Sequence, residues 1–281
     1  MKKVIALLLT FIMVLAVFAG CSANKPQAKN EPQTRIEKIK AAGKLVMATD
    51  AAWPPFEYIG ANGEVSGSDI DLARDIAEGL GVKLEIINAS FDTLSTYIES
   101  GEADVILAAM TITEERKLTF DFSVPYTVAQ QYIIVKENNN DVSVVEDMAG
   151  YKIGTHLGTT GDFLICDAID LDDGALNGTG ASYAQYKALP DAALDLNNGK
   201  LEAIVCDVLM AKNLVSVNEG LKCFELFYAD GTGTSEEYGV AAAKGDAEFI
   251  AKINEIISPL VADGTIDGYI VKHTEIASKM D

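Results

Sequence analysis

The chain has 281 residues, of which 22 are Lys or Arg and 42 are Asp or Glu, so its formal net charge is −20 at pH 7. This acidity argues against binding to nucleic acid and against docking on anionic lipid through a basic patch. It leaves open the binding of a zwitterion, because a small molecule is recognised by the local charges of its site.

The N-terminus has the pattern of a secretory signal. Lysines at positions 2 and 3 precede an apolar run that ends at Ala19, and Gly20-Cys21 follow. We interpret residues 1–20 as a signal peptide and Cys21, whose context resembles a lipobox, as the acylated, palmitate-bearing first residue of an exported lipoprotein. The polar residues 21–34 are expected to form a flexible tether. The alternative is an uncleaved transmembrane helix, but the run is shorter than the ~20 residues that span a bilayer.

Three cysteines follow Cys21, at positions 166, 206 and 223. An exported protein can form disulfides, but at most one intramolecular pair is possible among the three if Cys21 is lipidated. Buried free thiols are an equally good expectation. Their spacing does not indicate a metal site, and we predict no cofactor.

Helical and strand patterns alternate from residue 36 to residue 109. We expect strands at 44–49, 82–87 and 104–109, and helices just before Gly43, at 70–80 and at 92–100. Asp69 is expected to cap the second helix, and Gly101 to end the third. This alternation predicts βαβ units and a parallel sheet.

The second half of the chain repeats this plan. Gly101–Leu107 resembles Gly199–Val205, and Gly43–Val46 resembles Gly150–Ile153. Two copies are too few for a solenoid. We therefore predict two similar α/β lobes that face each other.

Ligands of open α/β sheets bind beyond the carboxyl ends of the strands. Such ends are expected at 49–50 and 108–111 in the first half and at 155–160 and 206–207 in the second. A cleft lined by both sets would close on a small molecule by a hinge motion.

A cation stands in an unusual place after the strand at 104–109. Thr113 is expected to cap a short helix, and an anion is favoured in its first turn, yet Arg116 lies there. A guanidinium matches a carboxylate with two parallel hydrogen bonds, so Arg116 is a candidate for holding an anionic ligand. The alternative is a surface ion pair with Glu114, Glu115 or Asp121.

The stretch from Thr111 to Tyr126, TITEERKLTFDFSVPY, resembles the signature of polar amino-acid-binding proteins, the family 3 solute-binding proteins of ABC importers. The resemblance implies an α/β fold of two Rossmann-like lobes with a hinge and a central ligand cleft, as in type II periplasmic binding proteins. It implies a receptor, expected to be a monomer, that delivers an amino acid to an ABC permease.

The resemblance also implies that the chain crosses between the lobes twice. Lobe 1 would comprise residues 35–129 plus 231–281, and lobe 2 residues 130–230. The crossings would lie near Val128–Gln131 and Tyr228–Gly231.

Family roles carry over to the ends of the strands. Thr111 and Arg116 match the residues that hold the α-carboxylate of the ligand, and Thr159 and Thr160, at a helix N-terminus, would complete that site. Asp207 matches the acid that binds the α-ammonium; a surface helix cap is the alternative.

The remaining matched positions concern the ligand side chain. Asp50 and Trp53 would contact it, and Phe91 would form a second apolar wall, unless the two aromatic rings only fill the core. His156 is as often structural as ligand-binding. Contacts at the bottom of the cleft are expected from Ala108, Ala109 and Met110.

Several functions and ligands remain open. Arginine, lysine, histidine, glutamine and cystine would all suit such a site. An enzyme of the same fold, such as a prephenate-type dehydratase, would need a general acid in the cleft. The candidates Asp50 and Asp207 already have binding roles, and Glu57 is expected in a turn. A sensor of amino acids is the third possibility.

Overall fold

The computed structural model describes residues 34–139 and 142–280. The expected signal peptide at 1–20, the lipidation site Cys21 and nearly all of the tether lie outside these residues. In the part that is described, helices long and apolar enough to span a bilayer are absent. The chain from Arg35 onward forms a mixed α/β structure of two lobes.

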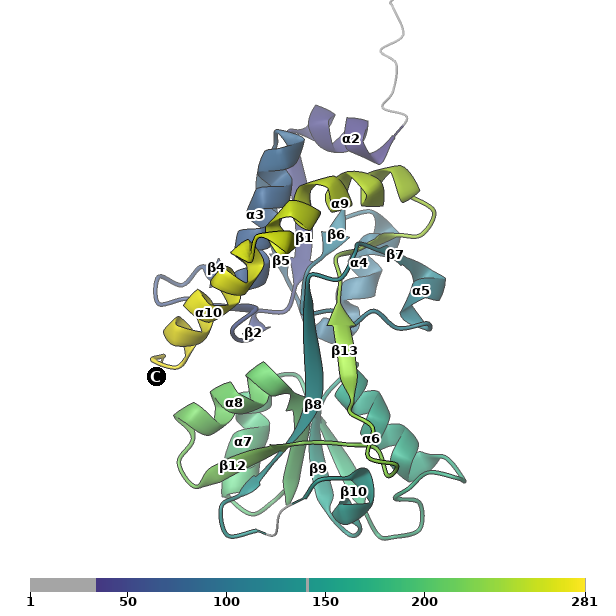
Figure 1. Ribbon diagram of the computed structural model, residues 1–281, viewed down its shortest axis with the longest axis vertical. Coiled ribbons are helices and arrows are strands. Elements are labelled where there is room, and N and C mark those ends of the chain that lie inside the picture. The colour runs from purple at the N-terminus through teal and green to yellow at the C-terminus, as the bar shows by residue number, and fades with distance from the viewer. Residues whose placement is uncertain (1–33, 140–141, 281) are drawn as a thin grey trace, which may run out of the picture. The chain divides into compact units, whose positions relative to one another are not determined.

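The first lobe is built on a five-stranded sheet (Figure 1). One strand of this sheet is parallel to both of its neighbours, and the strand that comes from the C-terminal part of the chain is antiparallel to both of its own. In spatial order the strands are β5 (Lys83–Asn88), β1 (Lys44–Thr49), β6 (Val105–Ile106), β14 (Ala241–Ala243) and β7 (Phe120–Phe122).

Two helices, α3 (Ser68–Leu80) and α9 (Ala247–Ala262), pack on this sheet because each has one apolar face. Ile70, Ile76 and Leu80 of α3 are buried, as are Phe249 and Ile253 of α9. The helices of this lobe are α2 (Arg35–Ala42), α3 (Ser68–Leu80), α4 (Leu94–Ser100), α5 (Arg116–Thr119), α9 (Ala247–Ala262) and α10 (Thr265–Ala277), with a 3-10 turn, η1 (Phe91–Thr93). A small sheet joins β2 (Ala52–Trp53), β3 (Glu57–Ile59) and β4 (Val65–Ser66).

The second lobe repeats the layered plan. The spatial order of its strands is β10 (Ser182–Tyr186), β9 (Lys152–His156), β11 (Ala203–Asp207), β8 (Thr127–Lys136) and β12 (Leu221–Glu225). Three helices, α6 (Thr160–Asp170), α7 (Leu189–Asn197) and α8 (Val208–Val217), cover it, and η2 (Val145–Met148) is a 3-10 turn. The βαβ order places the ends of β9 and β11 next to each other.

Two antiparallel strands run between the lobes (Figure 1). Strand β8 leaves the first lobe, and β13 (Ser235–Tyr238) returns beside it with Ser235 opposite Gln130 and Tyr238 opposite Thr127. At the second expected crossing, Tyr228–Gly231, the chain forms a turn closed by a hydrogen bond from Gly231 N to Tyr228 O, and the returning strand begins at Ser235. The lobe boundaries 129/130 and 230/231 stay predictions.

The expected helices and strands of the first half are present, with three corrections. Strand β6 is only two residues long. The helix expected at 92–100 begins as the 3-10 turn η1. Asp69 does not cap α3, because Gly67 is the capping residue and Asp69 lies inside the helix. Its buried carboxylate instead accepts hydrogen bonds from Ala109 N (2.9 Å) and Tyr126 Oη (2.8 Å).

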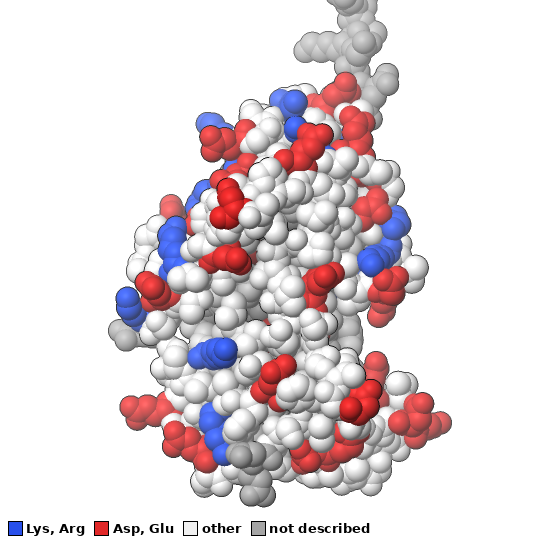
Figure 2. Space-filling view, in the orientation of Figure 1, with Lys and Arg blue, Asp and Glu red and all other residues white. Residues whose placement is uncertain are grey.

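The charged surface and the thiols fit the expectations from composition. On the face shown in Figure 2, Lys and Arg are scattered among acidic side chains. Cys166, Cys206 and Cys223 are free thiols, of which Cys206 is buried, so the structure contains no disulfide within its described residues.

Candidate functional site

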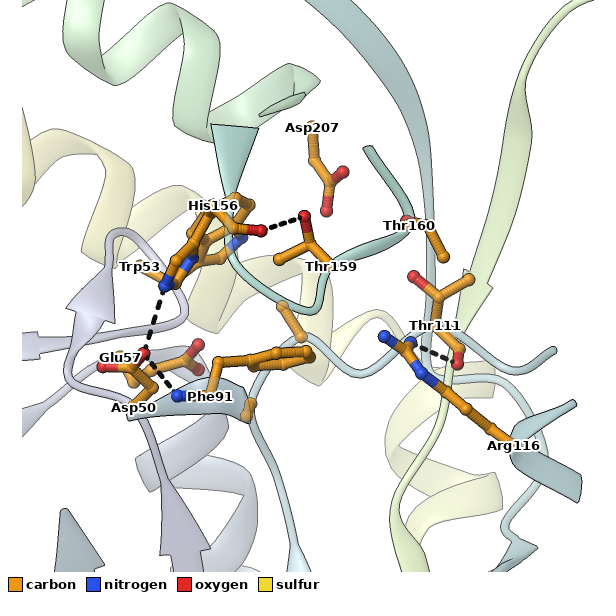
Figure 3. Close-up of a pocket in the computed structure, with 12 residues that line it drawn as sticks. Asp50, Trp53, Glu57, Phe91, Thr111, Arg116, His156, Thr159, Thr160 and Asp207 are labelled. Carbon is orange, nitrogen blue, oxygen red and sulfur yellow. Dashed lines mark hydrogen bonds and ion pairs between the residues drawn. The ribbon is translucent and has the colours of Figure 1, made fainter. Parts of the chain in front are cut away.

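A narrow cleft gathers most of the predicted site residues (Figure 3). Its lining includes residues from both lobes, and the space left between them is about 10 Å³, about enough for one water molecule. The lining residues are Asp50, Trp53, Glu57, Phe91, Ala108, Ala109, Thr111, Arg116, His156, Thr159, Thr160 and Asp207. Met110, which we also predicted, is buried outside this lining and packs in the core of the first lobe.

Arg116 reaches from the first residue of α5 across the cleft. Its guanidinium donates hydrogen bonds to Thr111 O (2.8 Å) in its own lobe and to Gly158 O (3.2 Å) in the other. Burial lowers the pKa of Arg116, and the nearby Glu236 and Asp207 oppose that shift. The predicted alternative, an ion pair with Glu114, Glu115 or Asp121, is wrong, because the guanidinium binds carbonyl oxygens and faces the cleft.

Thr113, which was expected to cap this helix, is not at its capping position, which Glu115 occupies, but its hydroxyl does bind the start of the helix. Thr113 Oγ1 accepts a hydrogen bond from Arg116 N at 3.1 Å, although regular helix begins only at Arg116. The hydroxyl thereby fixes the backbone that carries the guanidinium, which explains how a cation can stand at this helix start.

His156 lies between the two aromatic rings that were predicted to enclose a ligand side chain. Its ring stacks on Trp53 with centroids 5.1 Å apart and is tilted against Phe91 at 6.0 Å. His156 Nε2 is 3.4 Å from Asp50 Oδ2, and neither ring nitrogen has a hydrogen bond to any described residue. The imidazole thus occupies the place between the aromatic walls, next to an acid.

Thr159 and Thr160 lie at the start of α6, as predicted. Thr159 caps the helix by accepting from Asp162 N at 3.3 Å, and its hydroxyl donates to His156 O at 2.8 Å. The hydroxyl of Thr160 is directed elsewhere and donates to Glu236 Oε2 at 2.8 Å. The helix N-terminus therefore faces the cleft, an electrostatic setting that favours an anion.

Asp207 ends β11 and is buried. Its Oδ1 accepts from Gln131 Nε2 at 2.5 Å, and its Oδ2 accepts from the hydroxyl of Tyr238. Burial, followed by the nearby charge of Glu236, raises the pKa of Asp207 to about 7. Asp207 does occupy the capping position of α8, but its side chain makes no capping hydrogen bond. The surface-cap alternative is therefore wrong.

Glu57 belongs to the cleft, contrary to the prediction that it lies in a turn. It begins β3 and is 0% exposed, and its two carboxyl oxygens have no hydrogen-bond partner among the described residues. Burial, then the charges of Asp69 and Asp50, raise its pKa well above the ordinary value. A sequence signal existed, because Glu57 is an acid between Phe56 and Tyr58, both of which are buried.

Three residues that were not predicted, Gln131, Glu236 and Tyr238, come from the strands that join the lobes and bind residues of the cleft. Gln131 Nε2 donates to Glu236 Oε1 at 3.1 Å as well as to Asp207, and the hydroxyl of Tyr238 also donates to Asp207. These residues lie away from the expected strand ends. Only the pairing of β13 with β8 brings them next to the cleft.

A model of the bacterial extracellular solute-binding proteins, family 3, matches residues 45–275. The chain belongs to this family. A curated relative, the L-cystine-binding protein TcyJ of Escherichia coli (strain K12), is 28% identical over 257 residues, which cover 91% of this chain and 90% of the relative.

Solved structures agree with this membership. A mutant of ArgBP from T. maritima is 34% identical, with a TM-score of 0.75 over 85% of this chain and 99% of that chain. AbpA from Streptococcus pneumoniae, bound to L-arginine, is 31% identical, with a TM-score of 0.77 over 87% of this chain and all of that chain (100%). These family members are binding proteins, and the comparisons give no support to the dehydratase alternative. Clusters of side chains able to hold a metal ion are absent from residues 34–139 and 142–280.

The raised pKa of Asp207 predicts a stability that depends on pH. An unfolded aspartate has a pKa of about 3.9, so as the pH rises from about 4 to 7 the unfolded chain loses a proton that the folded protein keeps. The contribution of Asp207 to the free energy of unfolding should therefore fall over this range. We expect the difference between wild type and Asp207→Asn, measured by urea unfolding without ligand, to decrease from pH 4 to pH 7.

Asp195→Asn is a control for which the change in stability with pH should have the opposite sign. Lys200 and Tyr186 lower the pKa of Asp195 by hydrogen bonding, so the stability that Asp195 contributes is lost as the pH falls. The difference between wild type and Asp195→Asn should rise with pH. If the difference in the free energy of unfolding between wild type and Asp207→Asn stays flat or rises from pH 4 to pH 7, the raised pKa of Asp207 is contradicted.

Proposed function

We propose that this protein captures a basic amino acid between its lobes and delivers it to an ABC permease. The observation that carries the proposal is the presence of Arg116 and Asp207, one from each lobe, in the lining of one cleft. Opposite charges at the two sides of a small space match the two charged groups of an α-amino acid. Family membership supports the same function, because the matched family consists of solute-binding proteins.

The α-carboxylate of the ligand would lie at the Arg116 end of the cleft. Thr111 and Arg116 of the first lobe supply a hydroxyl and a guanidinium, and Thr159 and Thr160 supply the N-terminus of α6. The α-ammonium would bind Asp207. An ammonium would pair the buried carboxylate and lower the pKa that burial now raises.

The other end of the cleft favours a positively charged side chain. Asp50 and Glu57 lie there together (Figure 3), and Glu57 has no hydrogen-bond donor of its own among the described residues. Trp53 and Phe91 offer aromatic faces for a flat cation, an attraction of about 1 kcal/mol. A cationic side chain would satisfy the two acids, whereas glutamine has no charge to pair with them, and the second carboxylate of cystine would be repelled by them. AbpA, a structural relative, is bound to L-arginine.

Binding would require the lobes to separate and close again. The space of about 10 Å³ is far smaller than an amino acid, so a ligand must displace His156 from between the aromatic walls or widen the cleft. The two strands that join the lobes, β8 and β13, are the elements about which such a motion would occur.

We propose further that the protein is an extracytoplasmic lipoprotein, anchored at Cys21 after removal of residues 1–20. The support is the sequence pattern alone: basic residues, an apolar run and Gly20-Cys21. The proposed anchor would keep the receptor, which we expect to be a monomer, near its permease.

A screen by thermal shift tests the function. At 100 times its dissociation constant, a ligand stabilises the folded protein by about 2.7 kcal/mol. We expect L-arginine or L-lysine to raise the melting temperature most among the twenty amino acids and cystine. A uniformly flat screen would contradict the proposed function.

Arg116→Ala should weaken binding of the ligand found in that screen. A carboxylate left without its guanidinium costs at least about 2 kcal/mol, which corresponds to about a 30-fold rise in the dissociation constant. Isothermal titration calorimetry measures this rise in the dissociation constant. Lys117→Ala, which removes an exposed cation of the same helix, is the control. A loss below twofold would rule out the role of Arg116.

Glu57→Gln should alter selectivity. A hydrogen bond between charged groups contributes about 1.5–3 kcal/mol, so we expect the affinity for L-arginine to fall about tenfold or more. Binding of L-glutamine, if it is detectable, should change far less. Glu64→Gln removes the same charge from an exposed position near β4 and should leave both affinities unchanged. Equal losses for the two ligands would show that Glu57 does not contact the side chain.

Cys21→Ser should release the protein from the membrane. Without the thiol no acyl chain can be attached, so we expect the variant in the soluble fraction and the wild type in the membrane fraction of cells, measured by immunoblot. Cys223→Ser removes a different thiol and is the control, which should stay in the membrane fraction. Equal membrane retention of wild type and Cys21→Ser would contradict the lipid anchor.

A further inference from the structure

Glu236 occupies the junction of the two lobes. It lies on β13, and its Oε2 accepts hydrogen bonds from Thr111 Oγ1 of the first lobe and from Thr160 Oγ1 of the second, both at 2.8 Å. Its Oε1 accepts from Gln131 Nε2 at 3.1 Å. One carboxylate oxygen thus joins hydroxyls from opposite sides of the cleft.

The two hydroxyls belong to residues of the proposed carboxylate site. Thr111 and Thr160 both line the cleft, together with Arg116. The charge of Glu236 also acts on the guanidinium, since it is the largest of the charges that hold up the pKa of Arg116 against burial. Glu236 therefore makes the contacts expected of the carboxylate of a bound amino acid, although it belongs to the protein.

We propose that Glu236 is a further residue of the ligand site: it holds the lobes together in the absence of amino acid, and it competes with the carboxylate of the amino acid for Thr111 and Thr160. The inference rests on the proposed function, because the competitor is the α-carboxylate of that ligand.

Electrostatics make the two carboxylates exclude each other. Asp207 already lies nearby, and Gln131 donates to both it and Glu236. A ligand carboxylate beside Glu236 would add a third negative charge around Arg116. Like charges at such distances in a partly buried site repel strongly. Glu236 must therefore release the hydroxyls when the ligand carboxylate takes them.

The side chain of Glu236 has a second position available to it, outside the junction. Its side chain is only half-buried, and it also lines a groove on the outer side of the junction, bordered by Thr113, Leu164 and Tyr228. A rotation of the side chain toward this groove would place the carboxylate in water. The two hydroxyls would then be free for the ligand.

The experiment compares Glu236→Ala with wild type in two measurements. Small-angle X-ray scattering without ligand reports the separation of the lobes through the radius of gyration. Calorimetry with L-arginine as the probe reports affinity. Glu236→Gln keeps an acceptor oxygen but loses the charge, and Glu237→Gln removes the charge of an exposed neighbour on the same strand.

We expect Glu236→Ala to enlarge the ligand-free radius of gyration and to lower the dissociation constant of L-arginine about threefold or more, because the competing closed state is removed. Glu236→Gln should lie between it and wild type, and Glu237→Gln should match wild type. An unchanged radius, or weaker binding of L-arginine by Glu236→Ala, would overturn the proposal. If wild type binds no amino acid, the proposed function fails, and the scattering result still decides whether Glu236 holds the lobes.

Discussion

The burial of carboxyl groups around a narrow cleft is the constraint on which the site depends. Asp207, Glu57 and Asp69 are buried, and burial is the largest cause of the raised pKa of each. Ionised carboxylates without a partner would cost several kcal/mol in such surroundings. Hydrogen-bond donors such as Tyr126, which binds Asp69, and Tyr238, which binds Asp207, moderate that cost. A cationic ligand moderates it better, because it pairs with the ionised form.

The topology explains why these groups meet. Parallel strands bring their carboxyl ends to one edge, which places Asp50 after β1 and Asp207 at the end of β11. The joining strands add side chains that belong to neither edge, namely Gln131 on β8 and Glu236 on β13. A change in the angle between the lobes would alter the contacts of Glu236 and Arg116 together, since both have partners in the two lobes.

The sequence predicted the parts of the site that follow from local patterns. Strand runs placed Asp50 and Asp207 at strand ends, and an arginine in the first turn of a helix marked Arg116. It could not predict Glu236, because the contacts of that residue arise from the pairing of β13 with β8, in which Glu236 lies opposite Ala129, a residue far away in the sequence. Asp69 was misjudged for a related reason. An acid before an apolar helix is typical of a cap, and only tertiary packing sends its carboxylate to Ala109 N and Tyr126.

Charge and shape together limit what the cleft can accept. An acidic side chain at the Glu57 end would add a carboxylate to Asp50, Glu57 and Asp69, where burial and then the charges of Asp69 and Asp50 already raise the pKa of Glu57. A cation there lowers the energy of all three groups at once. Under the proposed function, the aromatic faces of Trp53 and Phe91 would attract a cation and would favour a flat group, the shape that the ring of His156 now presents. Under the proposed function, the acids and the aromatic rings together would favour a guanidinium over an ammonium, because only the guanidinium is both cationic and flat.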